Sequence, residues 1–226
     1  MRNEIDMITD CNLLNVLIEC LYETNSVKVN FSEPFTLSSG IKSPIYVDTM
    51  TLMSSRHAHY ASTNLIAQVG LDEKSRDGNT VVSVCPGGIP WGQTLAFSKA
   101  WNSLFCYKTP KTYGLKNQLE GELCDDARIV IVDDTITTGS AVLAVIDAIK
   151  REGKPDSEVL SVFTMIDWDF KEVNEMFISK GIEKHHLLTM MDIIEYGHKY
   201  GPTDEKNYLT DEEYTKLVDF MTESHK

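Results

Sequence analysis

From residue 80 onward the chain alternates between short apolar segments, rich in β-branched residues, and segments with helical periodicity. Strands are predicted at residues 80–84, 103–107, 128–132, 158–166 and 185–191, and helices at 89–101, 139–151 and 169–181. Apolar strands that alternate with helices are typical of βαβ units, whose parallel sheet is covered on both faces. We therefore predict an α/β fold with a central, mainly parallel sheet flanked by helices.

The segments before and after this alternation differ in texture. Leu13, Leu17 and Leu21 follow helical spacing within residues 5–22, so an amphipathic N-terminal helix is expected there. Residues 27–51 are β-branched and aromatic and are broken by Gly and Pro, which favours short strands and turns. A helix is predicted at residues 56–70, where it ends at a glycine, and a last one at 210–223.

The domain organisation follows from what the sequence lacks. We see no internal repeat, low-complexity tract or long Pro/Ser linker, and 226 residues suit one large α/β domain. We predict a single domain over residues 1–226, with a small N-terminal subdomain at about 1–50 and a sheet core at about 51–200. The helix at 210–223 closes the chain.

Composition excludes several classes of function. The net charge of −13 disfavours nucleic-acid binding and attraction to an anionic membrane, since both need clustered Lys and Arg. No apolar run approaches the ~18 residues of a membrane span. The five cysteines form no CxxC pair and no signal peptide is evident, so we expect reduced thiols and a cytoplasmic protein. The histidine clusters at 57–59 and 185–186 lack zinc-site spacing and are expected at the surface or a strand edge.

Two adjacent carboxylates mark the candidate site. Asp133 and Asp134 follow the apolar strand at 128–132, and ligands in parallel sheets bind beyond the carboxyl ends of strands. The next helix begins near Gly139, where free N–H groups, the helix dipole and nearby hydroxyls favour a phosphate. Carboxylates accept hydrogen bonds from a diol, so the pattern suits a ribose 5-phosphate, and no P-loop lysine follows. The alternative is a helix-capping cluster beside two solvated acids.

Three motifs carry a resemblance to a known family. "IVIVDDTITTGSA" resembles the ribose-phosphate motif of the type I phosphoribosyltransferases. "PFTLSSGIKSPIYVD" at 34–48 resembles the N-terminal motif of the orotate phosphoribosyltransferases, where it forms part of a hood over the base. "YKTPKTYGLKNQLEG" at 107–121 resembles the mobile loop of that family. The motifs occur in the family's order, and the hood motif discriminates orotate enzymes from those acting on other bases.

The resemblance implies an activity. The family member would be a pentosyltransferase that transfers phosphoribosyl from 5-phosphoribosyl 1-diphosphate to orotate, giving orotidine 5′-phosphate and diphosphate in pyrimidine biosynthesis. The implied cofactor is Mg²⁺, held mainly by the substrate and near Asp133 and Asp134. The family's loop commonly reaches a neighbouring subunit, so the resemblance also implies a homodimer with shared active sites.

The resemblance assigns site residues in four groups. The catalytic group comprises Lys108, Lys111, Asp133 and Asp134. The 5-phosphate group comprises Thr135, Ile136, Thr137, Thr138, Gly139 and Ser140, and the diphosphate group Pro86, Gly87 and Gly88. The mobile loop contributes Tyr107, Tyr113 and Gly114. The base and hood group comprises Phe35, Ser38, Ser39, Gly40, Lys42, Ser43 and Tyr46.

The chain also departs from the family pattern. Tyr107 and Tyr113 stand where the family loop usually has Arg and His, and Gly87 stands where many members have Lys. Asp167-Trp168 replaces a common Asp-Arg whose Arg faces the orotate carboxylate, and no Arg follows Asp48. Lys42 or hood amides would substitute. Two alternatives therefore stay open: an enzyme for another base, which would use uracil or hypoxanthine instead of orotate, and a sensor that binds the diphosphate sugar without consuming it.

Overall fold

The computed structural model describes residues 4–69, 71, 77–110, 117–154, 156–201 and 208–224, with side chains from Leu13 to Glu223. Contacts group the chain into two units, Met1–Leu65 with Leu188–Lys226, and Ile66–Leu187. The expected single domain stays a prediction.

The second unit is built on a six-stranded sheet. Its strand order is β10-β9-β8-β5-β6-β7, with β5 (Thr80–Cys85), β6 (Asn102–Tyr107), β7 (Leu119–Glu120), β8 (Arg128–Ile136), β9 (Glu158–Asp167) and β10 (Glu183–Thr189). Strand β5 pairs in parallel with β6 and β8, and β8 pairs in parallel with β9, whereas β7 is antiparallel to β6. The predicted mainly parallel sheet is confirmed.

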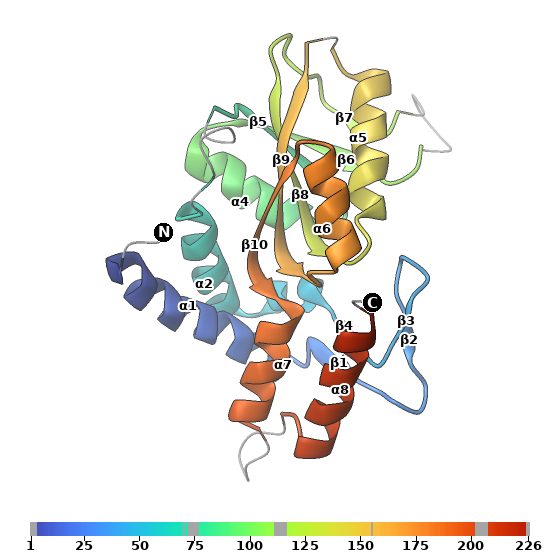
Figure 1. Cartoon of the computed structure of the whole chain (residues 1–226). Coiled ribbons are helices and arrows are strands. Elements are labelled where there is room, and N and C mark those ends of the chain that lie inside the picture. Colours follow the sequence, from blue (N-terminus) through green and yellow to red (C-terminus); the bar gives the residue numbers. More distant parts are fainter. Residues whose placement is uncertain are drawn as a thin grey trace. The chain divides into compact units, whose positions relative to one another are not determined.

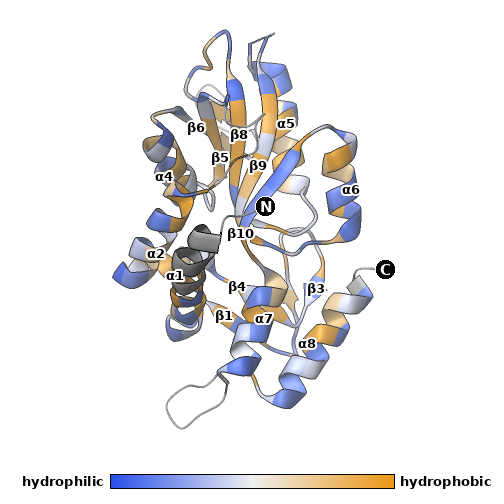
Figure 2. Ribbon diagram, turned by 60° about the vertical axis from the view of Figure 1, so that its left-hand side comes forward, coloured by the Kyte–Doolittle hydropathy of each residue, from blue (hydrophilic) through white to orange (hydrophobic). Residues whose placement is uncertain are grey.

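Three helices flank this sheet. Helix α4 (Ile89–Lys99) lies on one side, and α5 (Ser140–Glu152) and α6 (Lys171–Ser179) lie on the other (Figure 1). The central strands β5, β8 and β9 are therefore buried on both faces, which is why their sequences are continuous apolar runs. Figure 2 shows these strands as hydrophobic, whereas the edge strand β10 is largely hydrophilic.

The first unit combines helices with two small antiparallel pairs. Its elements are α1 (Glu4–Glu23), β1 (Val27–Val29), β2 (Phe35–Thr36), β3 (Lys42–Ser43), β4 (Ile45–Val47), η1 (Thr49–Ser54), α2 (Arg56–Ala67), α7 (Met190–Lys199) and α8 (Asp211–Ser224). Strand β1 pairs with β4, and β2 pairs with β3. The buried Tyr22 hydroxyl donates to the Ile193 carbonyl at 2.9 Å and its ring packs on Tyr208, which ties α1 to α7 and the segment before α8.

The sequence prediction missed the short strand β7 and helix α7, and it placed the ends of β8 and β10 differently. Strand β8 continues to Ile136, so the acidic pair lies within the strand instead of just after it, because β9 keeps pairing with it as far as Ile136 opposite Asp167. Strand β10 ends at Thr189 and helix α7 follows at once, although residues 185–191 were predicted as strand throughout. The Thr189 side chain accepts from the Asp192 amide, and Asp192 accepts from the Thr189 amide, so a capping box starts the helix there.

Candidate active site

The acidic pair occupies the carboxyl end of β8 in two different environments. Asp133 is 2% exposed, whereas Asp134 is half-buried, and the Asp134 amide donates to Asp133 Oδ1 at 2.9 Å. Burial raises the pKa of Asp133 well above its usual range, and the neighbouring Asp134 carboxylate adds to this rise, while the Lys108 ammonium partly opposes it. Asp133 therefore keeps its proton to higher pH than an exposed carboxyl does.

The side chains of Asp133 and Asp134 leave β8 on opposite faces of the sheet, although their carboxyl groups still share a hydrogen bond. Gly92 of α4 lies against Ser83 and Val81, so these β5 residues face α4. Ser83 is paired with Val132 across a parallel ladder, and side chains alternate along a strand, so Asp134 shares the α4 face and Asp133 does not. A Cβ built on Gly87 would lie only 2.3 Å from Asp134 Oδ1, which places the turn before α4 directly against this carboxylate.

That turn leaves the start of α4 without a side-chain cap. Gly88 is the N-cap residue and brings no side chain to cap α4. The Gly88 amide donates to the Val84 carbonyl at 2.8 Å, and the Ile89 amide donates to the Pro86 carbonyl at 3.2 Å. A Cβ on Gly88 would lie 2.2 Å from the Val132 carbonyl oxygen, so only glycine allows the turn to approach β8 this closely. The predicted diphosphate residues Pro86, Gly87 and Gly88 are thus brought next to the acidic pair.

Helix α5 also begins without a side-chain cap. Its N-cap is Gly139, which has a φ of 73° and makes no capping hydrogen bond, while Thr138 Oγ1 donates to Ser140 Oγ at 3.1 Å. The Thr135 hydroxyl, just upstream, is buried and has no hydrogen-bond partner within the described residues. The alternative of a helix-capping cluster is therefore wrong, because the hydroxyls do not cap the helix.

Two other helices of the same chain are capped by side chains, whereas α6, with Phe170 at its N-cap, has no side-chain cap either. Thr189 caps α7, and Thr210 accepts from the Glu213 amide at the start of α8 at 3.2 Å. Helices α4 and α5 instead begin with glycine beside the acidic pair. Uncapped amides at a helix N-terminus carry partial positive charge and hold anions. The geometry offers an anion position at the start of α5, and on the α4 side it places the Gly87 turn against Asp134.

Part of the predicted mobile loop is described at its base. The Tyr107 amide donates to the Gln118 carbonyl at 3.0 Å, and Gln118 Nε2 donates back to the Tyr107 carbonyl at 2.9 Å. Tyr107 and Lys108 are exposed. Lys111, Tyr113 and Gly114 lie outside the described residues. These two hydrogen bonds therefore hold Tyr107 and Gln118 together beside the carboxyl end of β6.

Most of the predicted hood residues form the β2–β3 hairpin of the first unit, whereas Tyr46 lies in β4, which pairs with β1. The Phe35 and Tyr46 rings lie 5.7 Å apart, and the exposed Lys42 ammonium donates to Thr36 Oγ1. Ser43 is buried and its hydroxyl donates to the Ile45 carbonyl at 2.7 Å. The hairpin tip holds the remaining hood residues, Ser38, Ser39 and Gly40.

Gly40 has a φ of 88° at this tip, and its amide donates to the Leu37 carbonyl at 2.8 Å. A left-handed backbone of this kind favours glycine, which explains why the serine-rich tip ends with that residue. The Ser39 hydroxyl is buried without a hydrogen-bond partner in the described part of the chain.

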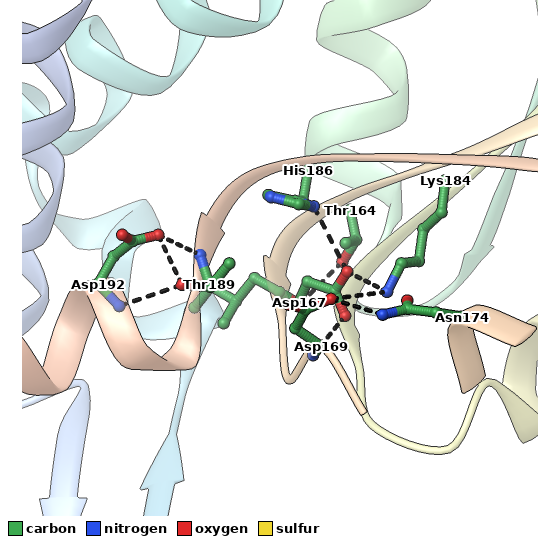
Figure 3. A network of polar contacts seen from close by, with 9 residues as sticks. Thr164, Asp167, Asp169, Asn174, Lys184, His186, Thr189 and Asp192 are labelled. Carbon is green, nitrogen blue, oxygen red and sulfur yellow. Dashed lines mark hydrogen bonds and ion pairs between the residues drawn. The ribbon is translucent and has the colours of Figure 1, made fainter. Parts of the chain in front are cut away.

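One polar cluster was missed by sequence reasoning. Asp167, at the end of β9, is 1% exposed and pairs with the Lys184 ammonium, while His186 Nδ1 lies 3.4 Å from its Oδ2 (Figure 3). Burial alone would raise the pKa of Asp167, but hydrogen bonds from His186 and Lys184 outweigh it and lower the pKa. The strand-edge histidine was anticipated, but its partner was not, because the two residues come from separately predicted strands. The usable signal was the hydrophilic "EKHH" run at the start of β10.

The cysteines behave as expected from the sequence. The four cysteines whose side chains are described form no disulfide with one another: Cys20, Cys85, Cys106 and Cys124. Burial, followed by the nearby Glu152, raises the pKa of Cys106 to about 12, so its thiol is not a nucleophile at neutral pH. None of the described helices is long and apolar enough to span a membrane.

Solved structures share this fold. The orotate phosphoribosyltransferase of Aeropyrum pernix matches with a TM-score of 0.64 and 24% identity, covering 79% of this chain and 97% of that one. The UMP synthase of Leishmania donovani matches with a TM-score of 0.70 and 19% identity, covering 92% of this chain and 42% of that one. The fold is that of the type I phosphoribosyltransferases.

Curated relatives narrow the class. The orotate phosphoribosyltransferase of Streptococcus pneumoniae serotype 4 is 31% identical over 196 residues, which cover 85% of this chain and 87% of the relative. The orotate phosphoribosyltransferase of Lactococcus lactis subsp. lactis is 29% identical over 200 residues, which cover 88% of this chain and 91% of the relative. A search against family models gave no match. The chain belongs to the orotate phosphoribosyltransferase family.

Proposed function

We propose that this protein is an orotate phosphoribosyltransferase, which transfers the phosphoribosyl group of 5-phosphoribosyl 1-diphosphate to orotate and releases diphosphate. One observation carries the proposal. Two helices begin at glycines, without a side-chain cap, next to a carboxylate pair, which suits a ligand with a phosphate at one end, a diphosphate at the other and a diol between them. An orotate phosphoribosyltransferase of Mycobacterium tuberculosis that shares the fold, with a TM-score of 0.58 and 22% identity, was solved with this sugar diphosphate.

Each phosphate has its own candidate cradle. The 5-phosphate would bind the first amides of α5 and the hydroxyls of the 5-phosphate group, Thr135, Ile136, Thr137, Thr138, Gly139 and Ser140. The diphosphate would bind at the Gly87 amide in the turn before α4, since the Gly88 amide already donates to the Val84 carbonyl at 2.8 Å. Asp133 and Asp134 would accept hydrogen bonds from the ribose hydroxyls.

The acidic pair would also contribute to the chemical step. As the bond between the ribose C1 and the diphosphate breaks, positive charge develops on the ring. That charge favours the ionised form of Asp133, whose buried carboxyl resists ionisation in the free protein. The interaction is therefore stronger in the transition state than in the ground state, which is the condition for catalysis. Lys108 and Lys111 would neutralise the departing diphosphate and exclude water.

Magnesium fits this site as a substrate-borne ion. The described residues contain no group of three or more His, Cys, Asp or Glu side chains arranged to hold a metal. Mg²⁺ is typically held by one or two carboxylates together with substrate phosphates and water, and the half-buried Asp134 can supply such a carboxylate. When bound, the ion would balance the charge of the diphosphate.

The base would be read by the hood. The aromatic pair Phe35 and Tyr46 offers a stacking surface, and Lys42 is an exposed cation on the same hairpin as Phe35. Trp168, which stands where many relatives have an arginine, is buried and supplies no charge. We therefore assign the orotate carboxylate to Lys42 and to backbone amides of the hood. Ser38, Ser39 and Ser43 are the remaining candidates, and Gly40, whose amide already donates to the Leu37 carbonyl, shapes the tip.

The wider setting is proposed on the same grounds. A cytoplasmic homodimer, with Tyr107, Tyr113 and Gly114 on a loop that closes over a shared site, follows the family's pattern. The net charge of −13 is unfavourable for nucleic acid or anionic lipid partners.

The test is loss of orotate absorbance in the ultraviolet with the sugar diphosphate and Mg²⁺ present. Consumption of orotate that requires both additions supports the proposal, and a reaction lacking the diphosphate is the control. A flat trace with orotate but turnover with uracil or hypoxanthine would replace it with an enzyme for another base. Binding of the sugar diphosphate with no turnover of any base would indicate a sensor.

A further inference from the structure

The turn that follows β9 supports the start of the phosphate-binding loop, which we define as residues 137–140. The Trp168 amide donates to the Ile136 carbonyl at 2.9 Å, and the strand register pairs Ile136 with Asp167. Ile136 is the last residue of β8 before the loop. The loop therefore leaves the sheet from a backbone group that the turn holds in place.

The helix that follows the turn supports the other end of the same loop. A Cβ built on Gly139 would lie 3.0 Å from Met176 Cε and 3.2 Å from Phe177 Cε2, so both α6 side chains lie against this glycine. Helix α6 begins at Lys171, directly after the turn. One continuous segment, residues 167–177, thus contacts the phosphate-binding loop at both ends.

A chain of polar contacts fixes that segment to the edge strand (Figure 3). Lys184 and His186 of β10 hold Asp167, and Asp167 Oδ1 accepts from the Asp169 amide at 2.9 Å. Asp169 has a φ of 57°, a conformation that non-glycine residues adopt only when their surroundings hold them there. Its carboxylate accepts from Asn174 Nδ2 of α6 at 2.7 Å, which completes the connection from β10 to α6.

We infer that Asp167, held by Lys184 and His186, is a positioning residue for the phosphate-binding loop. The inference rests on the proposed function, because it assigns the loop to the sugar diphosphate. A buried ion pair gives little net stability compared with apolar packing, so stability alone does not account for a charged network in a buried strand end. Its effect is geometric: it sets the turn and α6, and these set Ile136 and Gly139. Loosening it should weaken binding of the sugar diphosphate and leave the base unaffected.

The test compares substitutions of two lysines: Lys184 of β10, which pairs with Asp167 at the end of β9, and Lys154, which precedes the start of β9. Lys184→Met removes the cation that holds Asp167, and Lys184→Arg retains a cation. Lys154→Met is the matched control, since Lys154 also lies near two carboxylates, at 3.4 Å from Glu122 and 3.6 Å from Asp125, but precedes the opposite end of β9. KM for each substrate, kcat and the melting temperature are measured for all three, well below the melting temperature. Affinity for the sugar diphosphate alone is measured by calorimetry.

We expect Lys184→Met to raise KM and Kd for the sugar diphosphate about ten-fold, with KM for orotate unchanged within about two-fold. Lys184→Arg should recover most of this loss, and Lys154→Met should match the parent protein. Unchanged KM and Kd in a folded Lys184→Met protein would overturn the inference, as would a rise confined to the KM for orotate.

Two further measurements keep the test decisive. If Lys184→Met does not fold, His186→Asn removes the second contact of Asp167 from a half-exposed position, and the same selective rise of about two- to four-fold is expected. No change in this variant would count against positioning. If the parent protein binds the sugar diphosphate without consuming orotate, the proposed function fails but the calorimetry still decides the inference.

Discussion

Asp133 and Asp167 stand at the carboxyl ends of neighbouring strands and are equally buried, yet their electrostatic surroundings are opposite. Burial and the neighbouring Asp134 carboxylate raise the pKa of Asp133. For Asp167 burial is outweighed by His186 and Lys184, so its pKa is lowered. The difference shows which of the two buried carboxyl groups has a compensating positive charge within the fold. Asp167 has its cations within the fold, whereas the Lys108 ammonium only partly offsets the rise in the pKa of Asp133, which fits a site whose further positive charge arrives with the substrate.

The two carboxyls should therefore respond oppositely to pH. Because the folded protein binds a proton at Asp133 more tightly than the unfolded chain does, this group's contribution is fully present at low pH and falls as pH rises from the unfolded pKa toward the folded one. Asp167 is the reverse case. Its contribution is present above the unfolded pKa and is lost as pH falls through the lowered folded pKa.

The largest expected effect comes from removing the charges of Asp133 and Asp134. Asp133→Asn combined with Asp134→Asn should lower kcat/KM by at least about 10³-fold while circular dichroism stays native, because the side chains keep their shape but lose the charge that opposes the ribose cation. The rate of orotate consumption measures this. Asp125→Asn with Asp126→Asn is the matched control, as these adjacent aspartates are exposed and precede the same strand. Native activity in the first variant would refute the roles assigned to the pair.

The next effect is on stability and comes from removing the cation that pairs with Asp167. Lys184→Met should lower the free energy of unfolding by about 3–5 kcal/mol, because it leaves the Asp167 carboxylate buried without its main cation. Urea unfolding monitored by tryptophan fluorescence measures it. Adding Asp167→Asn should recover a large part of the loss, since no unpaired charge then remains. A loss below about 1 kcal/mol, as expected for the exposed pair of Lys154, would show that water reaches Asp167.

The sequence predicted one of these carboxyls and missed the other for a physical reason. Asp133 and Asp134 sit in a local pattern, an apolar strand before them and a hydroxyl-rich helix start after them, so spacing along the chain is enough to find them. Asp167, Lys184 and His186 are brought together by strand order alone, and no local spacing connects β9 with β10. The apolar periodicities likewise located the strands and helices, but the end of β8 depended on pairing with β9 and could not be read from residues 128–132.

The uncapped helix starts were predictable only in part. The glycines near residues 87 and 139 were visible, and a phosphate position was expected at each. Whether Thr138 and Ser140 cap α5 could not be told from composition, because the same residue types serve as caps and as ligands. The geometry decided this, since the two hydroxyls bond each other and Gly139 occupies the N-cap.

A smaller effect tests how closely the turn at Gly87 lies against the Asp134 carboxylate. Gly87→Ala would place a methyl group 2.3 Å from Asp134 Oδ1, and the half-buried carboxylate should move aside. We expect kcat/KM to fall about ten-fold with little loss of stability. Gly92→Ala is the comparison: its Cβ would lie 2.0 Å from Ser83 Oγ in the core, so stability should fall while KM values are kept. Equal kinetic effects in both variants would contradict the assigned position of Asp134.

The smallest effect separates the two carboxyls most directly. Asp133→Asn alone should stabilise the protein by on the order of 1 kcal/mol at pH 8, because an amide carries no charge that burial penalises. The gain should shrink toward pH 4, where the parent residue is itself protonated in the folded state. Melting temperatures across this pH range measure it, and Asp126→Asn should show no comparable trend. An Asp133→Asn protein that is less stable than the parent at pH 8 would mean that the buried carboxylate is already compensated in the free protein, and the contrast with Asp167 would fail. A protein that is more stable and inactive would show that the chain keeps a destabilising acid at the end of β8 for the sake of the reaction.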